Sequence, residues 1–193
     1  MRILMLGNSF TYYHDLPDMV AELTGAEVRS HTRGGARLAE QLNERTEMGA
    51  RTMKALREER WDYVVLQEQS NAPSTTPKAY RKNVARLCAL VRQAGAVPVI
   101  YATWAYEKGN DWYAKESMTY DALYEGLTAS FTEAARENGA LLAPAGEAFR
   151  RGSAEGAALY DPDGRHPSAE GSRLAAGIIA GTILAYERGS RNA

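Results

Sequence analysis

The chain has 193 residues, with 23 Lys and Arg against 24 Asp and Glu, which gives a formal net charge of −1 at pH 7. That balance argues against a dedicated nucleic-acid binder or a protein of acidic membrane surfaces, both of which normally carry a basic excess. Hydrophobic residues make up 45% of the chain and charged residues 24%, so there is enough apolar material for a buried core, and a disordered chain is excluded.

Neither the cysteine content nor the apolar segments indicate a metal site or a membrane segment. The single cysteine, Cys88, cannot form an intramolecular disulfide, and no Cys/His cluster has the spacing of structural zinc. The run Ile3–Leu6 is too short for a signal-peptide core, and the stretch from Ala175 to Tyr186 is well short of the ~20 residues of a membrane span. We therefore expect a soluble, cytoplasmic protein with no metal, cofactor, membrane or nucleic-acid partner.

Short apolar runs bounded by polar residues or glycine predict five strands. They are Ile3–Leu6, the residues around Val28, Tyr63–Leu66, Val97–Ala102 and Ala140–Ala143. The first, third and fourth runs are nearly continuous, as in parallel strands buried on both faces. The second is more polar and is expected at a sheet edge. Pro98 lacks an N–H donor, so it is tolerated only near the start of its strand or on an edge.

Helical spacing of apolar residues fills the gaps between these strands. The segments are Leu16 to Thr24, Leu38 to Leu56, Pro77 to Gly95, Leu123 to Asn138 and Ser168 to about Arg188. The second segment reads as a broken helix with Gly49 near its middle. In the last one, Gly177 and Gly181 are expected to let the backbone approach the sheet closely.

Alternation of strand and helix predicts one α/β domain over residues 1–193. The expected architecture is a three-layer αβα fold with right-handed crossovers and a five-stranded parallel sheet of flavodoxin-like order 2-1-3-4-5. In such a sheet, ligands bind at the carboxyl ends of the strands, where the order reverses between strands 1 and 3. The segments Gly7–Thr11, Arg33–Arg37 and Gln67–Asn71 follow the first three strands. We expect these three segments to converge on one crevice.

A serine in the first of these segments could act as a nucleophile. The hydroxyl of Ser9 would need a general base, and that base would need an orienting partner. His166 lies in a turn before the last helix, and Asp163, three residues upstream, could fix its tautomer and leave the other ring nitrogen for Ser9. His14 and His31 remain alternative bases, although only His14 has an adjoining carboxylate, that of Asp15.

Three blocks of the sequence resemble the SGNH (GDSL-like) hydrolase superfamily in the order of that family. They are Gly7-Asn8-Ser9-Phe10-Thr11, Gly34-Gly35, and Asp163-x-x-His166-Pro167-Ser168. The resemblance implies that Ser9 is the nucleophile and that Asp163 and His166 complete a catalytic triad. It also implies an oxyanion hole made by the N–H of Ser9, the N–H of Gly35 (or Gly34) and an amide side chain.

The sequence departs from the family pattern in two places. The usual Gly-Asp-Ser is Gly7-Asn8-Ser9 here, and the usual Gly-x-Asn-Asp block is replaced by Gln67-Glu68-Gln69. Gln69 could supply the amide of the family's oxyanion asparagine with one more methylene, and Gln67 is the alternative. Asn8, Gly34 and Gln67 are also expected to contact the substrate.

The expected function is a serine esterase that acts through an acyl-enzyme on a small-molecule ester. An acyltransferase with the same triad and a non-catalytic sugar- or phosphate-binding module are the alternatives. The segment after the fourth strand carries aromatic residues: Trp104, Tyr106, Trp112 and Tyr113. If they form a wall of the crevice, with Trp104 against the substrate, they favour short acyl groups and O-acetylated carbohydrate. Otherwise they anchor the loop or a subunit contact. The oligomeric state stays open.

Overall fold

Five parallel strands form one sheet in the computed structural model, which describes residues 1–191. They are β1 (Arg2–Gly7), β2 (Glu27–Thr32), β3 (Tyr63–Leu66), β4 (Val97–Tyr101) and β5 (Leu141–Ala143). Their order is β2-β1-β3-β4-β5, which confirms the predicted topology. The order reverses beside β1, so the segments that follow β1, β2 and β3 emerge next to one another at the carboxyl edge.

The burial of each strand follows its sequence. All of β3, and β1 from Ile3 onward, are buried, because apolar side chains on both faces need a layer of helices on each side. The more polar β2 lies at the edge of the sheet, as predicted, and most of its residues are partly exposed. Pro98 is the second residue of β4, so its missing donor falls at the start of an inner strand.

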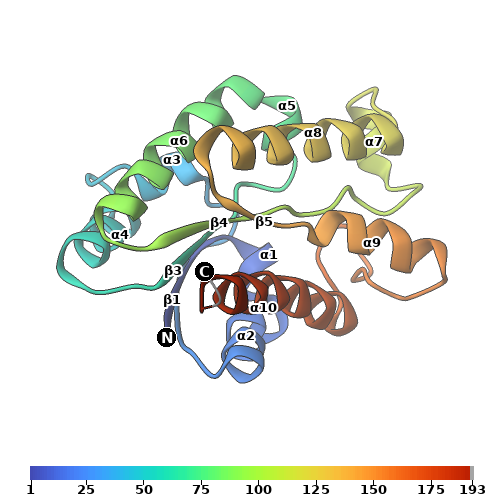
Figure 1. Cartoon of the computed structure of the whole chain (residues 1–193). Coiled ribbons are helices and arrows are strands. Elements are labelled where there is room, and N and C mark those ends of the chain that lie inside the picture. Colours follow the sequence, from blue (N-terminus) through green and yellow to red (C-terminus); the bar gives the residue numbers. More distant parts are fainter. Residues whose placement is uncertain (192–193) are drawn as a thin grey trace.

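Helices cover both faces of this sheet. Their bounds are α1 (Ser9–Tyr12), α2 (Leu16–Thr24), α3 (Leu38–Gln41), α4 (Glu47–Glu58), α5 (Ala72–Thr75), α6 (Pro77–Gln93), α7 (Asp111–Lys115), α8 (Tyr120–Asn138), α9 (Ala145–Ala154) and α10 (Ala169–Arg191). Figure 1 shows α2 and α10 on one side of the strands and α4, α6 and α8 on the other. The predicted three-layer α/β architecture is confirmed.

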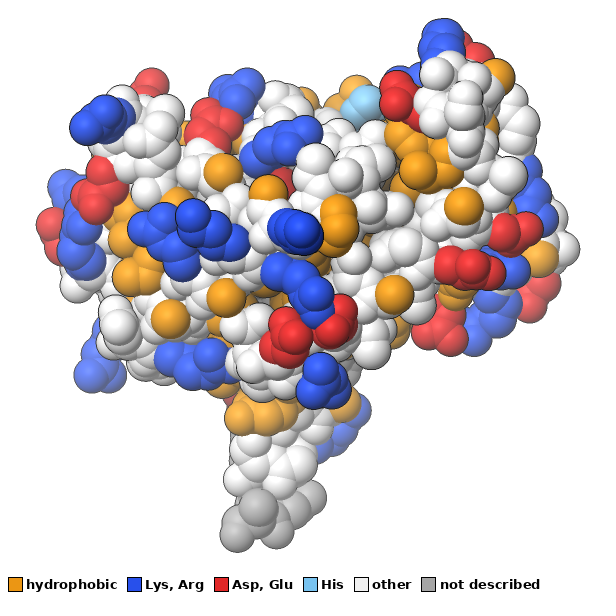
Figure 2. All heavy atoms as spheres, turned by 90° about the horizontal axis from the view of Figure 1, so that it is seen from above, with side chains coloured by type: hydrophobic (Ala, Val, Ile, Leu, Met, Phe, Trp, Pro, Cys, Tyr) orange, Lys and Arg blue, Asp and Glu red, His pale blue; other side chains and the backbone are white. Residues whose placement is uncertain are grey.

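The outer face of the α6–α8 layer carries charges of both signs. Figure 2 shows Lys and Arg side chains interspersed with Asp, Glu and hydrophobic side chains on this face. Arg81 of α6 forms ion pairs with Glu133 and Glu137 of α8, which join the two helices across the surface. Within residues 1–191, no helix combines the length and the apolar character needed to cross a membrane.

The predicted broken helix is present as α3 and α4, but Gly49 does not break it. The interruption lies between Gln41 and Glu47, and Gly49 lies inside α4. A Cβ at Gly49 would collide with the carbonyl oxygen of Asn43, so this glycine permits close packing rather than a break. The role expected of Gly177 and Gly181 was wrong, because a Cβ at either position would point into open space with no atom within 4 Å, so the packing of α10 does not require glycine there.

Candidate active site

The turn from β1 into α1 places Ser9 at the carboxyl edge of the sheet. Asn8 caps α1, since its side-chain Oδ1 accepts a hydrogen bond from the N–H of Phe10 at 3.1 Å. Its Nδ2 donates to the carbonyl oxygen of Ala36 at 3.0 Å, which ties this turn to the loop after β2. Only glycine fits at position 7, because a Cβ there would collide with the side chains of Thr11 and Gln67.

Gln67 holds this turn from the neighbouring strand end and does not face the substrate. Its Oε1 accepts hydrogen bonds from the N–H of Asn8 at 2.8 Å and from Oγ1 of Thr11 at 2.9 Å. Its Nε2 donates to the carbonyl oxygen of Glu68, and the residue is 1% exposed. The predicted contact between Gln67 and substrate is therefore wrong. The side chain fixes the position of the Ser9 turn instead.

Ser9, His166 and Asp163 form a continuous hydrogen-bonded chain. Ser9 Oγ lies 2.9 Å from Nε2 of His166, and Nδ1 of His166 lies 2.5 Å from Oδ2 of Asp163. The other carboxylate oxygen of Asp163 accepts the backbone N–H groups of Arg165 and His166, each at 2.9 Å. A carboxylate that accepts from Nδ1–H leaves Nε2 with its lone pair toward the serine. The structure brings together the three residues that the sequence singled out.

Hydrogen bonding controls the charge of Asp163. Partial burial by itself acts to raise the pKa of this carboxyl. The bonds from the His166 ring and from the N–H groups of Arg165 and His166 outweigh burial and hold the pKa below its ordinary value. Asp163 is therefore ionised at neutral pH.

The other two histidines do not contact Ser9. Nε2 of His14 lies 3.6 Å from Oδ1 of Asp161. His31 is buried beneath α4, and its Nδ1 lies 3.0 Å from the hydroxyl of Thr52. In the part of the chain that the structure describes, His166 is the histidine in hydrogen-bond contact with the serine.

Aromatic rings pack against His166 on two sides. The ring of Tyr13 stacks on the imidazole with centroids 4.3 Å apart, and Phe10 meets it edge-on at 5.5 Å. Tyr13 is followed by His14 and Asp15 with φ of 52° and 56°, a left-handed conformation that is unfavourable for residues with a Cβ. This strained turn directs Tyr13 toward His166, and no motif in the sequence marked it.

A cavity of about 250 Å³ opens beside Ser9. It is lined by Asn8, Ser9, Phe10, Gly35, Gln69, Ser70, Tyr106, Arg165 and His166. Gly35 has φ of 68°, which favours glycine, and its N–H donates to no other backbone group in residues 1–191. The N–H of Ser9, as the first residue of α1, has no partner within the helix. Gly34 is exposed and does not line the cavity, so of the two glycines Gly35 is the one that lies beside Ser9.

Gln69 lines this cavity with an unpaired amide oxygen. Its Nε2 donates to Oγ of Ser70 at 3.1 Å, and its buried Oε1 has no partner among the described residues. The Ser70 hydroxyl in turn lies 2.7 Å from that of Tyr106. Rotation of the amide by 180° would let Oε1 accept from Ser70 and would free Nε2 as a donor. Of the two glutamines in this segment, Gln69 is the one beside Ser9.

Glu68 joins the two loops on either side of the cavity. Its Oε1 accepts the N–H of Gln69 at 2.7 Å and the N–H of Leu38 at 3.3 Å. Burial raises the pKa of this carboxyl, against the lowering effect of these two hydrogen bonds and of Arg37. The carboxyl thus fixes the backbone of Gln69 relative to the segment that follows Gly35.

Trp104 does not contact the cavity, which corrects the prediction that it binds substrate. It is 1% exposed and lies between the rings of Phe10 and Phe149, with centroids 4.9 Å and 3.7 Å away. Its Nε1 donates to the carbonyl oxygen of Arg165 at 3.0 Å, so it supports the turn that carries His166. Trp112 and Tyr113 are also buried, which fits the alternative that these aromatics anchor the loop.

Arg165 is a cavity residue that the sequence reasoning missed, although it stands next to His166. Its Nη2 lies 3.1 Å from Oδ1 of Asp111, and its Nε donates to Oδ1 of Asn110 at 3.3 Å. The guanidinium also lies over the ring of Tyr106, 5.4 Å from the centroid. These contacts hold a fixed positive charge at the rim of the cavity.

Comparisons with known proteins agree with this arrangement. Residues 5–174 match the model of the GDSL-like Lipase/Acylhydrolase family. A protein from Slackia heliotrinireducens described as an SGNH hydrolase is 52% identical, with a TM-score of 0.92 over 95% of this chain and 98% of its own. No curated protein sequence is significantly similar.

More distant structures share the fold. An acetyl xylan esterase is 13% identical with a TM-score of 0.72, over 95% of this chain and 100% of its own. An acetyl-xylooligosaccharide esterase from Geobacillus is 14% identical with a TM-score of 0.70, over 94% and 93% of the two chains. The family match covers most of the sequence, and the family's serine, histidine and aspartate positions meet in one site. The chain therefore belongs to the GDSL-like lipase/acylhydrolase family of SGNH hydrolases and is a serine hydrolase of carboxylic esters.

Proposed function

We propose that this protein hydrolyses short-chain carboxylic esters, among them O-acetyl groups on carbohydrates, through an acyl-enzyme on Ser9. The observation that carries the proposal is the hydrogen-bonded chain from Ser9 Oγ through the His166 ring to Asp163, with distances of 2.9 Å and 2.5 Å. A serine hydroxyl becomes a nucleophile when a neutral imidazole accepts its proton.

In the proposed reaction, Ser9 Oγ attacks the ester carbonyl carbon while Nε2 of His166 takes the hydroxyl proton. The carbonyl oxygen becomes an oxyanion, held by the N–H groups of Ser9 and Gly35 and by the amide of Gln69. When the tetrahedral intermediate collapses, His166 returns the proton to the leaving alcohol. A water molecule then attacks the acyl-enzyme and gives a proton to His166. When the second tetrahedral intermediate collapses, His166 returns this proton to Ser9 Oγ as the acid is released.

The size and lining of the cavity support a short acyl group. About 250 Å³ is below the range of drug-sized pockets, and its walls include the polar side chains of Gln69, Ser70 and Arg165. Such walls suit an acetyl group and a hydroxylated alcohol better than a long alkyl chain. The acetyl xylan esterases resemble this chain in fold alone, so the substrate argument rests on the cavity.

Gln69→Ala should lower kcat by about 10²-fold and change KM little, because an oxyanion donor acts mainly in the transition state. Steady-state kinetics with p-nitrophenyl acetate measure both constants. Gln69→Asn, which keeps the amide on a shorter side chain, serves as the comparison and should recover part of the loss. If kcat of Gln69→Ala stayed within about threefold of wild type, Gln69 would not be an oxyanion donor, and backbone N–H groups alone would form the oxyanion hole.

Catalytic efficiency should fall steeply as the acyl chain of the substrate becomes longer. We expect kcat/KM for p-nitrophenyl esters to decrease from acetyl through butyryl to dodecanoyl, because the longest chain does not fit the cavity beside Ser9. The three esters share one leaving group, so differences report the acyl side only. A preference for the dodecanoyl ester would contradict the short-acyl proposal, and inactivity toward every acetylated sugar tested would contradict its carbohydrate part.

A further inference from the structure

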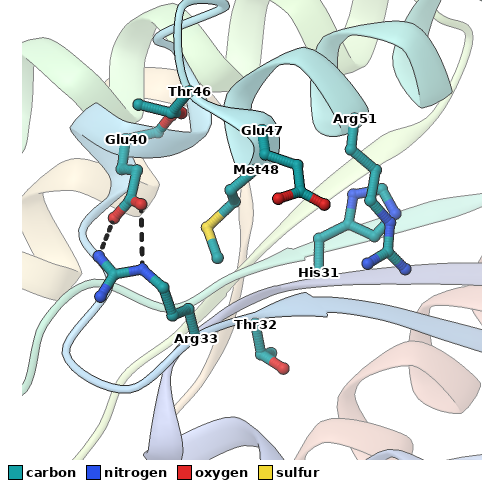
Figure 3. Close-up of a pocket in the computed structure, with 8 residues that line it drawn as sticks. All are labelled: His31, Thr32, Arg33, Glu40, Thr46, Glu47, Met48 and Arg51. Carbon is teal, nitrogen blue, oxygen red and sulfur yellow. Dashed lines mark hydrogen bonds and ion pairs between the residues drawn. The ribbon is translucent and has the colours of Figure 1, made fainter.

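A second cavity lies at the carboxyl edge of β2, next to the loop that supplies Gly35. Its volume is about 260 Å³. Figure 3 shows Glu47, Met48 and Arg51 extending from α4 toward the end of β2, and the His31 side chain extending from β2 toward them. Thr32 also lines the cavity. None of these residues belongs to the triad or to the cavity beside Ser9.

The hydrogen bonds around His31 fix which ring nitrogen carries the proton. The side-chain nitrogen of Gln41 donates to the backbone carbonyl oxygen of His31 at 3.0 Å, so its Oε1 is the atom that faces Thr52. The Thr52 hydroxyl donates to that oxygen at 2.6 Å. The hydroxyl oxygen of Thr52 has then used its hydrogen, so it can only accept a hydrogen bond from Nδ1 of His31, 3.0 Å away. Nδ1 must therefore carry a hydrogen.

His31 consequently offers an acceptor to the cavity. Burial, with the positive charges of Arg51 and Arg29, lowers the pKa of its imidazole to about 4, against an opposing effect of Glu59. The ring is neutral at physiological pH, and Nε2 keeps its lone pair. His31 is 1% exposed and lines the cavity, yet its Nε2 has no hydrogen-bond partner among the described residues. Nε2 is accessible from the cavity, so a ligand or water can donate a hydrogen bond to it.

Two of the charged side chains of this cavity form an ion pair with each other, and the other two can bind a ligand. Arg33 and Glu40 form a two-point contact, Nε to Oε1 at 3.1 Å and Nη2 to Oε2 at 2.5 Å. Glu47 and Arg51 lie four residues apart on α4, and both are exposed. They form no ion pair with each other, and Arg51 makes only a 3.4 Å bond to the carbonyl oxygen of Ser30. The cavity thus presents two acceptors, His31 and Glu47, and one donor, Arg51.

This donor and acceptor set selects a neutral, hydroxylated ligand. The carboxylate of Glu47 disfavours an anion, and the guanidinium of Arg51 beside a neutral imidazole disfavours a cation. A hydroxyl group donates one hydrogen bond and accepts others, so two neighbouring hydroxyls can pair with all three side chains. We infer that this cavity is a sugar-binding subsite, in which one hydroxyl of a vicinal pair donates to Nε2 of His31 and accepts from Arg51, while the other donates to Glu47.

The position of the cavity connects it to the proposed reaction. Arg33 lines this cavity and Gly35 lines the one beside Ser9, and two peptide links span at most about 7 Å between their Cα atoms. An oligosaccharide ester can therefore place its acetyl group at Ser9 and another sugar ring against α4. This inference rests on the proposed carbohydrate esterase function, and it assigns the leaving-group side of the substrate to the loop after β2.

Methyl NMR tests sugar binding without relying on catalysis. Met48 lines the cavity, so its ε-methyl group, labelled with carbon-13 and assigned with Met48→Leu, reports occupancy directly. Xylose, xylotriose, glycine and phosphate are titrated separately into the full-length Ser9→Ala protein. We expect saturable shifts of the Met48 signal with xylose and tighter binding of xylotriose. Glu47→Gln and Arg51→Gln should each weaken xylotriose binding about tenfold, since each replaces a hydrogen bond to a charged group with a weaker one to a neutral amide.

Matched controls come from the same helix. Glu58→Gln and Lys54→Gln remove exposed charges of α4 away from this cavity, and they should leave xylotriose affinity unchanged. Absence of a saturable sugar shift at Met48, a response to glycine or phosphate alone, or equal losses in both control variants would overturn the inference. Hydrolysis of p-nitrophenyl acetate by the wild-type enzyme is measured in parallel. Its absence would count against the proposed esterase and not against the sugar subsite.

Discussion

Ser9→Ala should abolish ester hydrolysis and leave thermal unfolding nearly unchanged. The serine hydroxyl is the atom that forms the acyl bond, and removal of a triad nucleophile in other serine hydrolases costs about 10⁴- to 10⁶-fold in kcat. The side chain makes one hydrogen bond, to His166, so its loss removes little stabilising contact. Initial rates with p-nitrophenyl acetate and a calorimetric melting curve measure the two quantities on one preparation.

An exposed serine provides the matched control. Ser153→Ala in α9 removes the same hydroxyl from a residue that does not line the cavity beside Ser9, and kcat/KM should stay within about twofold of wild type. If Ser9→Ala retained more than about a tenth of wild-type activity, Ser9 would not be the nucleophile.

His166→Ala should reduce kcat by a factor similar to that for Ser9→Ala, because members of a triad act as a unit. In the wild-type enzyme, kcat/KM should rise from acid pH and then level off, since only the neutral imidazole can accept the serine proton. Asp163 is already ionised at neutral pH, because its hydrogen bonds outweigh the effect of burial and hold its pKa below the ordinary carboxyl value. A profile that stays flat from acid to neutral pH would contradict a histidine base.

His14 distinguishes this assignment from the alternative base. His14→Asn keeps a residue that tolerates the left-handed backbone at φ 52°, and it should leave kcat within about twofold.

Asp163→Asn should lower kcat by about 10⁴-fold, because an amide no longer fixes the productive tautomer of His166. The lowered pKa of Asp163 also stabilises the fold above the carboxyl's unfolded pKa, and this stabilisation is lost as pH falls through the folded value.

The fold could be predicted where the hydrophobic pattern is unambiguous. Continuous apolar runs located β1, β3 and β4, and the polar character of the residues around Val28 placed β2 at the edge. The short helices α5, α7 and α9 were not predicted, because four to ten residues carry too little periodicity. The role of Gly49 was misread because a glycine can either interrupt a helix or let another backbone segment pack closely against it. Its role depends on the carbonyl oxygen of Asn43, which only the folded chain brings near.

The sequence predicted which segments at the strand ends form the site, but not the directions in which their side chains point. Gln67 and Gln69 are two residues apart and share one face of an extended chain. The structure separates them, since Gln67 turns toward Asn8 and Gln69 toward the cavity. The position of Trp104 was predicted wrongly because aromatic residues occur both in hydrophobic cores and in the walls of cavities. Its stacking on Phe149 depends on α9, which no sequence pattern joined to this loop.

The central claim, that Ser9 is the activated nucleophile of this fold, is tested most directly by labelling with a fluorophosphonate followed by peptide mass mapping. The reagent phosphonylates a serine hydroxyl that a neighbouring base activates, with loss of fluoride. We expect one adduct, on the peptide that contains Ser9, with loss of esterase activity in proportion to labelling and no adduct in Ser9→Ala or His166→Ala. Labelling of another serine, or full inhibition with Ser9 unmodified, would contradict the account.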